Sequence, residues 1–399
     1  MTLTSESATR IQEYLDSHKE CKTERVQRLE IAGALEDRPV YRIPTSLLYY
    51  NIKNGRFAAE YLMLKSRLCR DLDSNRREDV EEIEKLLLKD RGATKILKED
   101  LQKVGGQREP GIITYDGYVI NGNRRMAVYA ELAKETGDER WRYIEVSILP
   151  PGTDERTLWR IEAGLQFSRG ERLDYNKINV LLKFREGQQA GLTLDNIASS
   201  LYGGYTATEI NEELKRLELI DRFLDYISAP GQYKRVEDKH EHFVELQKFI
   251  DQQKRRGQDD EDTLKAIMYA FELIRVGYPH RKLRDLNGVM NNSGAKASFL
   301  EAADKATVVE TGSNGEVNGN SGAVNIALTP IVQAFEGSVD IVQANGEKSR
   351  PIILLRRALT NLENVDINLI KANDSELETM LQRMAVIIES IRGRLQKIR

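Results

Sequence analysis

The sequence predicts an α+β domain followed by a mostly helical region that contains a helix-turn-helix. Short apolar strand patterns alternate with helical patterns before residue 150, and helical periodicity dominates after it. Two capped helical patterns flank a glycine pair at residues 203–204. The chain has 399 residues, which is enough for two or three domains with a substantial core.

The composition is typical of a soluble globular protein. Hydrophobic residues make up 40% of the chain and charged residues 31%, and no apolar run approaches the length of a membrane span. The first residues lack a signal-peptide pattern, and Cys21 and Cys69 alone build neither a disulfide framework nor a cysteine zinc site. We therefore expect a cytoplasmic protein with no membrane partner. Because the net charge is −3, any contact with nucleic acid must come from a local patch.

The first part of the chain predicts one strand among several helices. Residues 1–36 are charged, and Ile11, Tyr14 and Leu15 share one helical face, so we expect an N-terminal helical arm. Polar and apolar residues alternate over 39–44, which predicts a short strand at the start of an α+β domain. Helical patterns follow over residues 57–68, 71–90 and 95–104.

A hairpin is predicted within residues 111–133, and a helix directly after it. Ile112–Thr114 and Tyr118–Ile120 are short apolar runs, and the Asp116-Gly117 pair between them suits a two-residue turn. The second strand ends in a tight turn over residues 121–123, and a helix is expected through residue 134.

The turn before this helix is typical of an anion site. A glycine turn at a helix N-terminus brings backbone N–H groups and the positive end of the helix dipole to one point. The fork-shaped donors of Arg124 and Arg125 match the geometry of phosphate. We therefore expect Gly122, Asn123, Arg124 and Arg125 to bind phosphate groups. The alternative is that both arginines pair with surface carboxylates.

A second loop of similar composition precedes the helix over 57–68. Asn54 and Gly55 form a turn, and Arg56 stands at the mouth of that helix. Two interpretations stay open. Asn54 and Arg56 face the same phosphates as Arg124, or they form an ordinary turn followed by a surface arginine.

The stretch Gly117–Ala130, GYVINGNRRMAVYA, resembles the phosphate-binding motif of the ParB/sulfiredoxin superfamily. In that family a hairpin strand leads into Gly-x-Arg-Arg and a helix, and Glu109–Ile113 is similar to the preceding family strand. The resemblance implies a ParB/sulfiredoxin-like domain over residues 37–150, closed by a strand over 143–149. It also implies that the turn holds a nucleoside triphosphate, CTP or ATP. Sulfiredoxins carry a reactive cysteine where Asn123 stands, so their chemistry is not implied.

A second motif of the family falls on the helix predicted over residues 153–167. ParB-type proteins have a Glu-Asn-x-Gln-Arg motif there, which serves the metal and the triphosphate. This chain offers Glu162, Gln166 and Arg169, with Ala163 in place of the asparagine and one extra residue of spacing. The resemblance implies that Gln166 and Arg169 bind the nucleotide, and that Glu162 is the catalytic residue and the ligand of Mg²⁺. On residue type alone, the alternative for Glu162 is a solvated helix face.

Residues 151–228 form a helical region with a helix-turn-helix pattern. Thr193 and Thr206 are placed to cap two helices around the glycine pair, and the pattern resembles the helix-turn-helix of ParB proteins. DNA would meet the outer face of the second helix, formed by Thr206, Thr208, Asn211 and Lys215. Glutamates on the same helix repel phosphates, so a helical pair used for packing or protein contact stays open.

The remainder of the chain is expected to be helical with one linker. We predict a helical domain over 229–305, a Gly/Asn/Ser linker over 306–326 and a C-terminal helical segment over 327–399. The last helix carries a near-heptad apolar stripe from Leu377 to Leu395. Such a stripe forms a homodimer seam or docks on its own domain.

These patterns lead to one main functional hypothesis and two alternatives. The main hypothesis is a ParB-like, nucleotide-responsive DNA-binding protein that acts as a homodimer, with a nucleoside triphosphate and Mg²⁺ as cofactors. One alternative is a metal-dependent nuclease or nucleoside triphosphatase of a mobile element or defence system, with Asp116 and Glu162 as candidate ligands. The other is an adaptor that uses its helical half for protein contacts. The sequence names neither the nucleotide base nor a DNA site.

Overall fold

The structure is a computed structural model that divides into two compact units. The first unit is formed by Met1–Asn287 with Gly322–Thr329, and the second by Gly288–Ser321 with Pro330–Arg399. Described residues are 5–52, 55–168, 176–201, 204–258, 260–312, 329–344, 350–363, 365 and 375–398. Among them, no helix is both long and apolar enough to cross a membrane.

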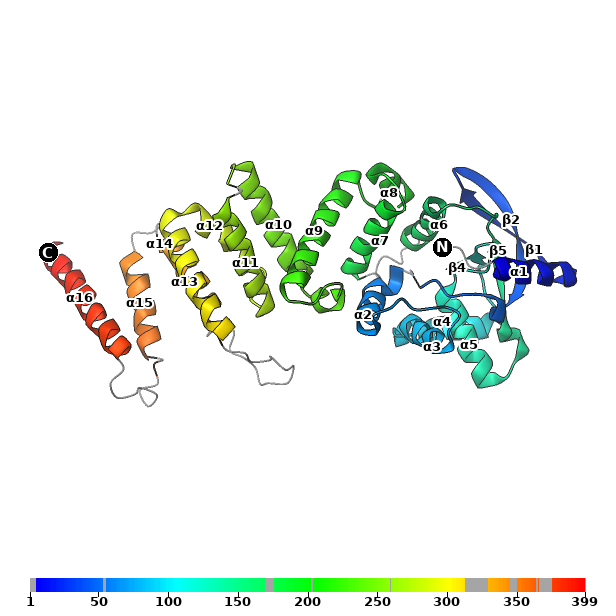
Figure 1. Ribbon diagram of the computed structural model, residues 1–399, viewed down its shortest axis with the longest axis horizontal. Helices are drawn as coiled ribbons and strands as arrows, with labels where there is room; N and C mark the ends of the chain where they lie inside the picture. The colour runs from blue at the N-terminus through cyan, green and yellow to red at the C-terminus, as the bar shows by residue number, and fades with distance from the viewer. Residues whose placement is uncertain are drawn as a thin grey trace. The chain divides into compact units, whose positions relative to one another are not determined.

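A five-stranded mixed sheet with the order β1-β2-β5-β3-β4 lies in the first unit (Figure 1). The pairs are antiparallel except β3 and β5, which run parallel with Ile112 opposite Ser147. The sheet and its helices confirm the predicted α+β class. The strands are β1 (Lys22–Ile31), β2 (Ala34–Pro44), β3 (Gly111–Ile113), β4 (Val119–Asn121) and β5 (Tyr143–Ile148).

Helices pack on both faces of this sheet because successive strand residues point to opposite sides. Ile113 and Val119 join the core formed with α3, α4 and α5, whereas Ile112 and Ile120 pack with Ile161 of α6. The helices of this part are α2 (Ala58–Leu68), α3 (Arg77–Leu87), α4 (Arg91–Val104), α5 (Asn123–Thr136) and α6 (Glu155–Ser168). A single 3₁₀ turn, η3 (Gly55–Phe57), precedes α2.

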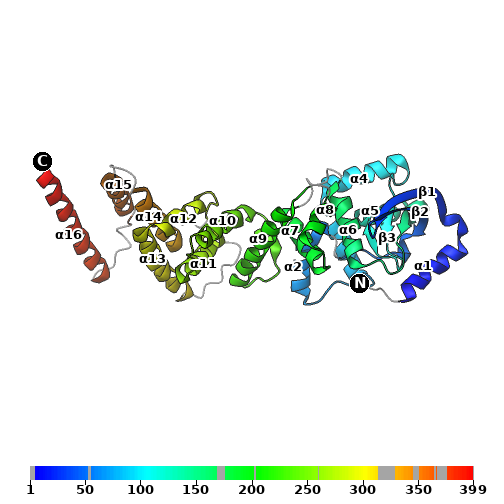
Figure 2. The same cartoon turned by 90° about the horizontal axis from the view of Figure 1, so that it is seen from above.

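The prediction of a helical arm over residues 1–36 is correct only for α1 (Ser5–Ser17), and it is wrong for β1 and the start of β2. Figures 1 and 2 show α1 beside a long β1–β2 hairpin. Ala32 and Gly33 both have positive φ, 50° and 84°, which is the geometry of a tight hairpin turn. In β1 only Leu29 and Ile31 are buried, because it is an edge strand with polar residues on both faces.

The predicted pair of capped helices around residue 203 is present. Thr193 accepts a hydrogen bond from the Asn196 N–H at the start of α8 (Leu194–Ser200). Thr206 and Glu209 form a reciprocal capping box at the start of α9 (Ala207–Tyr226). Apolar residues of both helices share a core with α7 (Lys177–Gln189): Phe184, Ile197, Leu201, Ile210 and Leu214.

Helices α10 (His240–Arg255) and α11 (Glu261–Arg275) extend the first unit. They pack on α9 through Phe223, whose ring centroid lies 5.4 Å from that of Phe243 and 5.5 Å from that of Phe271. The continuous part of this unit ends at Asn287, the second residue of a short helix, α12 (Leu286–Asn291).

In the second unit Phe299 and Phe335 join the first two helices, with their ring centroids 5.4 Å apart. Residues 306–312 of the predicted linker continue α13, and 313–326 lie outside the described residues. On α16 the side chains of Met380, Met384 and Ile388 in the apolar stripe are exposed. The homodimer seam that this stripe would form stays a prediction. The helices are α13 (Ser293–Gly312), α14 (Pro330–Ala344), α15 (Arg350–Glu363) and α16 (Ser375–Ile398).

Candidate anion-binding site at the start of helix α5

Helix α5 begins with a glycine, so no side chain caps its first turn. Gly122 is the N-cap with φ +108°, and its carbonyl accepts the first helical hydrogen bond from the Met126 N–H at 2.8 Å. A Cβ atom at this position would lie 3.5 Å from the Cα of Gly111, so the positive φ, not lack of space, favours glycine here. The result is the glycine-led helix start that the sequence predicts.

The two arginines of the motif are held by main-chain carbonyls on the segments beside α5. Arg124 Nε donates to the Leu87 carbonyl at the end of α3, at 3.3 Å, and Arg125 Nη1 donates to the Glu109 carbonyl just before β3. Both side chains are half-buried. These bonds orient the guanidinium groups and fix α5 to its neighbours.

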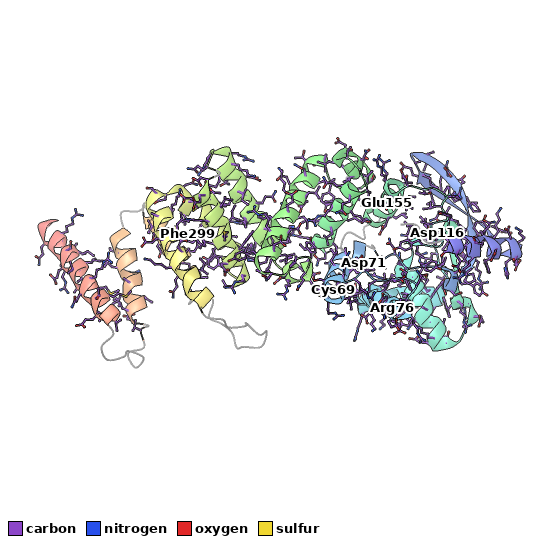
Figure 3. All side chains as sticks on the ribbon, in the orientation of Figure 1. Cys69, Asp71, Arg76, Asp116, Glu155 and Phe299 are labelled. Carbon is purple, nitrogen blue, oxygen red and sulfur yellow. The ribbon has the colours of Figure 1, made fainter. Side chains whose placement is uncertain are left out.

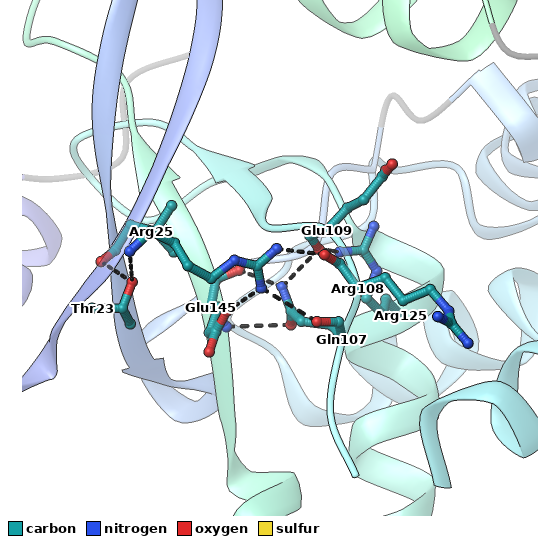
Figure 4. Close-up of polar contacts among 8 residues, drawn as sticks. Thr23, Arg25, Gln107, Arg108, Glu109, Arg125 and Glu145 are labelled. Carbon is teal, nitrogen blue, oxygen red and sulfur yellow. Dashed lines mark hydrogen bonds and ion pairs between the residues drawn. The ribbon is translucent and has the colours of Figure 1, made fainter. Parts of the chain in front are cut away.

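A polar network holds the segment to which Arg125 is bound (Figure 4). Gln107 is buried, and its amide donates to the Glu145 carbonyl on β5 and accepts from the Glu145 N–H. Arg25 of β1 donates to the Glu145 carboxylate at 2.6 Å and to the Gln107 carbonyl at 3.3 Å. Residues 107–109 are thereby tied to β1, β5 and α5, and the network sets where the Arg125 guanidinium lies.

Asn123 is buried and uses both ends of its amide within the protein. Its Nδ2 donates to the Val119 carbonyl and its Oδ1 accepts from the Asn51 N–H, both at 2.8 Å. Only 2% of Asn123 is exposed. Its side chain therefore joins β4 to the segment that leads into η3.

The neighbouring Ile52 N–H donates to the Tyr118 hydroxyl at 3.0 Å. Burial raises the pKa of Tyr118, so this phenol stays protonated. Two successive backbone amides, those of Asn51 and Ile52, are thus fixed by side chains from the hairpin and from α5. These two bonds hold Asn51 and Ile52 near the start of α5.

Glu162 is buried and forms an ion pair, so the solvated helix face is not its environment. Its Oε2 lies 2.8 Å from Lys183 Nζ of α7 and 3.4 Å from Asn51 Nδ2. Lys183 also contacts Glu186, at 2.9 Å, and none of its side chain is exposed. Burial lowers the pKa of Lys183, but the two carboxylates outweigh it and raise the pKa above its ordinary value.

A small cavity of about 120 Å³ lies beside this ion pair. Its walls include Asn51, Tyr118, Trp159, Glu162 and Glu186. Figure 3 labels Glu155, which also lines it, at the start of α6. The Trp159 indole N–H donates to the Lys183 carbonyl at 3.0 Å and so fixes one wall.

The residues around Glu162 do not suit a divalent cation. Mg²⁺ needs oxygen ligands in near-octahedral geometry, and here an ammonium group lies at hydrogen-bonding distance from the carboxylate. In the part of the chain that the structure describes, no three His, Cys, Asp or Glu side chains are grouped to hold a metal ion. Asp116, the other metal ligand considered for the nuclease, accepts a hydrogen bond from the Thr114 hydroxyl.

Four predicted ligands cannot be placed at the site. Asn54 and Arg169 lie outside the described residues, and so do the side chains of Arg56 and Gln166. The structure therefore brings Asn123 and Glu162 into one network through Asn51, with Gly122, Arg124 and Arg125 around the start of α5.

The predicted DNA-contact residues lie at the start and along one side of α9. Thr206 and Thr208 are exposed, and the Thr206 hydroxyl takes part in the capping box. Lys215 is exposed and lies 2.8 Å from Glu212, whose other carboxylate oxygen accepts from Gln247 of α10. The Glu212 carboxylate is thus already engaged by two side chains of the protein.

Asn51 and Lys183 belong to the site but were missed from the sequence. Each is a single polar residue within an apolar run, Tyr49–Ile52 and Val180–Phe184. A polar group in such a run is buried when the run is buried, and it then needs a partner. That signal is available in the sequence, although it does not name the partner.

Comparison of the chain with protein-family models, curated proteins and solved structures gives no match.

Proposed function

We propose that this protein is a ParB-like, nucleotide-responsive DNA-binding protein that holds nucleotide phosphates at the start of α5. The observation that carries the proposal is the glycine-led first turn of α5 with two oriented guanidinium groups. Backbone N–H groups, a helix dipole and arginine forks together favour a phosphate over a neutral ligand.

The buried network gives this site a connection to the helical region. Asn123 at the start of α5 binds Asn51, Asn51 binds Glu162, and Glu162 binds Lys183 on α7. Helix α7 shares its core with α8 and α9. An anion that shifts Asn51 would therefore bias the position of the helical pair, which is the form a nucleotide switch requires.

Replacing Arg124 with alanine tests the phosphate site. We expect nucleotide binding to weaken about ten- to a hundredfold, because a charge-assisted hydrogen bond contributes about 1.5–3 kcal/mol. The measurement is calorimetry and thermal shift of the full chain with CTP, ATP and GTP. A ligand at a hundredfold excess over its dissociation constant stabilises the wild type by about 2.7 kcal/mol.

The matched control is Arg77→Ala, an exposed arginine on α3 that pairs with Glu81. It should bind nucleotide like the wild type. Wild-type protein that binds none of the three nucleotides contradicts the proposal, as does an Arg124→Ala variant of unchanged affinity.

The proposed DNA surface is the exposed side of α9. The Glu209 carboxylate accepts from the Thr206 N–H, the Glu212 carboxylate accepts from Gln247, and Glu213 pairs with Arg216. Because these carboxylates already have partners, they repel a DNA phosphate less strongly than the same number of unpaired carboxylates would. Thr208, Asn211 and Lys215 are the polar residues that this surface would use.

Replacing Lys215 with alanine tests DNA contact. A lysine that meets a phosphate adds to affinity for every sequence, so DNA binding should weaken uniformly and the salt slope should fall by about 1. Lys19→Ala is the control, because Lys19 is an exposed lysine paired with a carboxylate three residues away, as Lys215 is. Unchanged affinity and salt slope in Lys215→Ala would remove α9 from the interface. The enzymatic and adaptor alternatives stay predictions.

A further inference from the structure

Lys183 is the one cation in contact with two carboxylates at the centre of the described site. Its Nζ lies 2.8 Å from Glu162 and 2.9 Å from Glu186, and its side chain has no exposed surface. Nζ also lies 5.8 Å from the centre of the Trp159 ring, on the side of the cavity wall. A lysine is almost never so buried unless it is paired on several sides, as it is here.

The Lys183 ammonium lies where the buried Glu162 carboxylate needs a positive charge. Glu162 has 5% of its side chain exposed, and a buried carboxylate without a counter-charge is strongly unfavourable. The same Oε2 atom accepts from Asn51, which in turn is bound to Asn123 at the start of α5. A positive charge beside Glu162 therefore holds the carboxylate to which Asn51 is bound, and Asn51 in turn is bound to the start of α5.

We propose that the Lys183 ammonium is the built-in cation of this site and takes the place that a divalent metal ion would have beside Glu162. Lys183 then acts as a positioning residue, through Glu162 and Asn51. The site needs no divalent ion to hold its shape, and it binds its anion in the presence of a chelator. Anion binding in the presence of a chelator rests on the function proposed above. The assignment of Lys183 as the cation beside Glu162 does not.

The first test uses metal ion alone. Mn²⁺ is added to wild-type protein and to Lys183→Met, and the melting temperature and bound Mn²⁺, by electron paramagnetic resonance, are measured without nucleotide. The wild type should bind no Mn²⁺ at Glu162 and should melt unchanged in Mn²⁺ or EDTA. Lys183→Met removes the ammonium that lies between Glu162 and Glu186, so the variant should melt lower, bind Mn²⁺ and recover part of the loss.

The control is Lys177→Met on the same helix, whose lysine is largely exposed and pairs with Glu241. It should gain no response to Mn²⁺, which separates the proposed role from general loss of a salt bridge. A folded Lys183→Met variant that ignores Mn²⁺ overturns the proposal. If Lys183→Met does not fold, the wild type decides: Mn²⁺ binding that Glu162→Gln removes overturns the proposal, and no such binding supports it.

A second arm keeps this inference separate from the proposed function. Nucleotide binding by the wild type is measured with Mg²⁺ and with EDTA. Equal binding supports the built-in cation, and binding that disappears with EDTA overturns it while leaving the phosphate site intact. If no nucleotide binds in either buffer, the proposed function fails and the Mn²⁺ results alone decide on Lys183.

Discussion

Glu162→Ala is expected to lower the free energy of unfolding of the first unit by about 3–5 kcal/mol. The substitution removes the nearer carboxylate from a fully buried ammonium and leaves only Glu186, whose side chain is 31% exposed. It also removes the acceptor of the Asn51 amide. A buried charge without its partner is among the few mechanisms that produce so large an effect.

Tryptophan fluorescence during urea unfolding measures this effect where it arises. The chain has two tryptophans, and both Trp141 and Trp159 are buried in the first unit. Trp159 lies directly beside Lys183. A signal confined to this unit is needed, because a chain of two units does not have to unfold in a single step.

Two comparisons make the Glu162 result specific. Glu139→Ala removes an exposed carboxylate paired with Arg142, and it should change stability by less than about 0.5 kcal/mol. The double variant Glu162→Gln with Lys183→Met replaces both charges by groups of similar size, and it should be more stable than the sum of the single changes predicts. A loss below about 1 kcal/mol in Glu162→Ala would mean that the pair is not buried as described.

Elements set by short-range signals could be predicted from the sequence. The β3–β4 hairpin depends on Gly117, which has φ +91°, and the start of α5 depends on Gly122. Helices α8 and α9 begin after Thr193 and Thr206, whose side chains cap them. In each case the residue that decides the structure lies within a few positions of the element it begins.

The β1–β2 hairpin could not be predicted in the same way. Charged residues along β1 imitate a surface helix, and only Leu29 and Ile31 show the period of a strand. What makes the segment a strand is its pairing with β2 and the contact of its two buried apolar residues with α6. The Ala-Gly turn at residues 32–33 was the available local signal.

The network around Glu162 also depends on contacts between residues that are far apart in the sequence. The resemblance indicates Glu162, and the glycine and arginines at a helix start indicate the turn residues. Asn51 and Lys183, however, reach Glu162 from 111 and 21 residues away in the chain. A single sequence does not show such pairs. Nor does it show that both ends of the Asn123 amide bind the protein itself.

Asn123→Ala is the second large effect that we expect, a loss of about 2–4 kcal/mol in the first unit. The change leaves the Asn51 N–H and the Val119 carbonyl without the Asn123 amide, and each buried polar group that loses its partner costs about 1–3 kcal/mol. Asn51 is 4% exposed, so water cannot easily replace the lost bond. Asn121→Ala, two positions earlier and half-exposed, is the control and should cost less than about 1 kcal/mol.

The same variant decides whether Asn123 binds phosphate itself or positions the residues that do. If it positions them, Asn123→Ala should both raise hydrogen exchange at residues 48–52 and weaken nucleotide binding, because the Asn51 N–H loses its bond to the Asn123 side chain. Asn123→Asp keeps an acceptor for the Asn51 N–H but sets a carboxylate oxygen against the Val119 carbonyl, so it should also lose stability. Binding that is lost while stability and exchange stay at wild-type values would instead make the Asn123 amide a direct ligand.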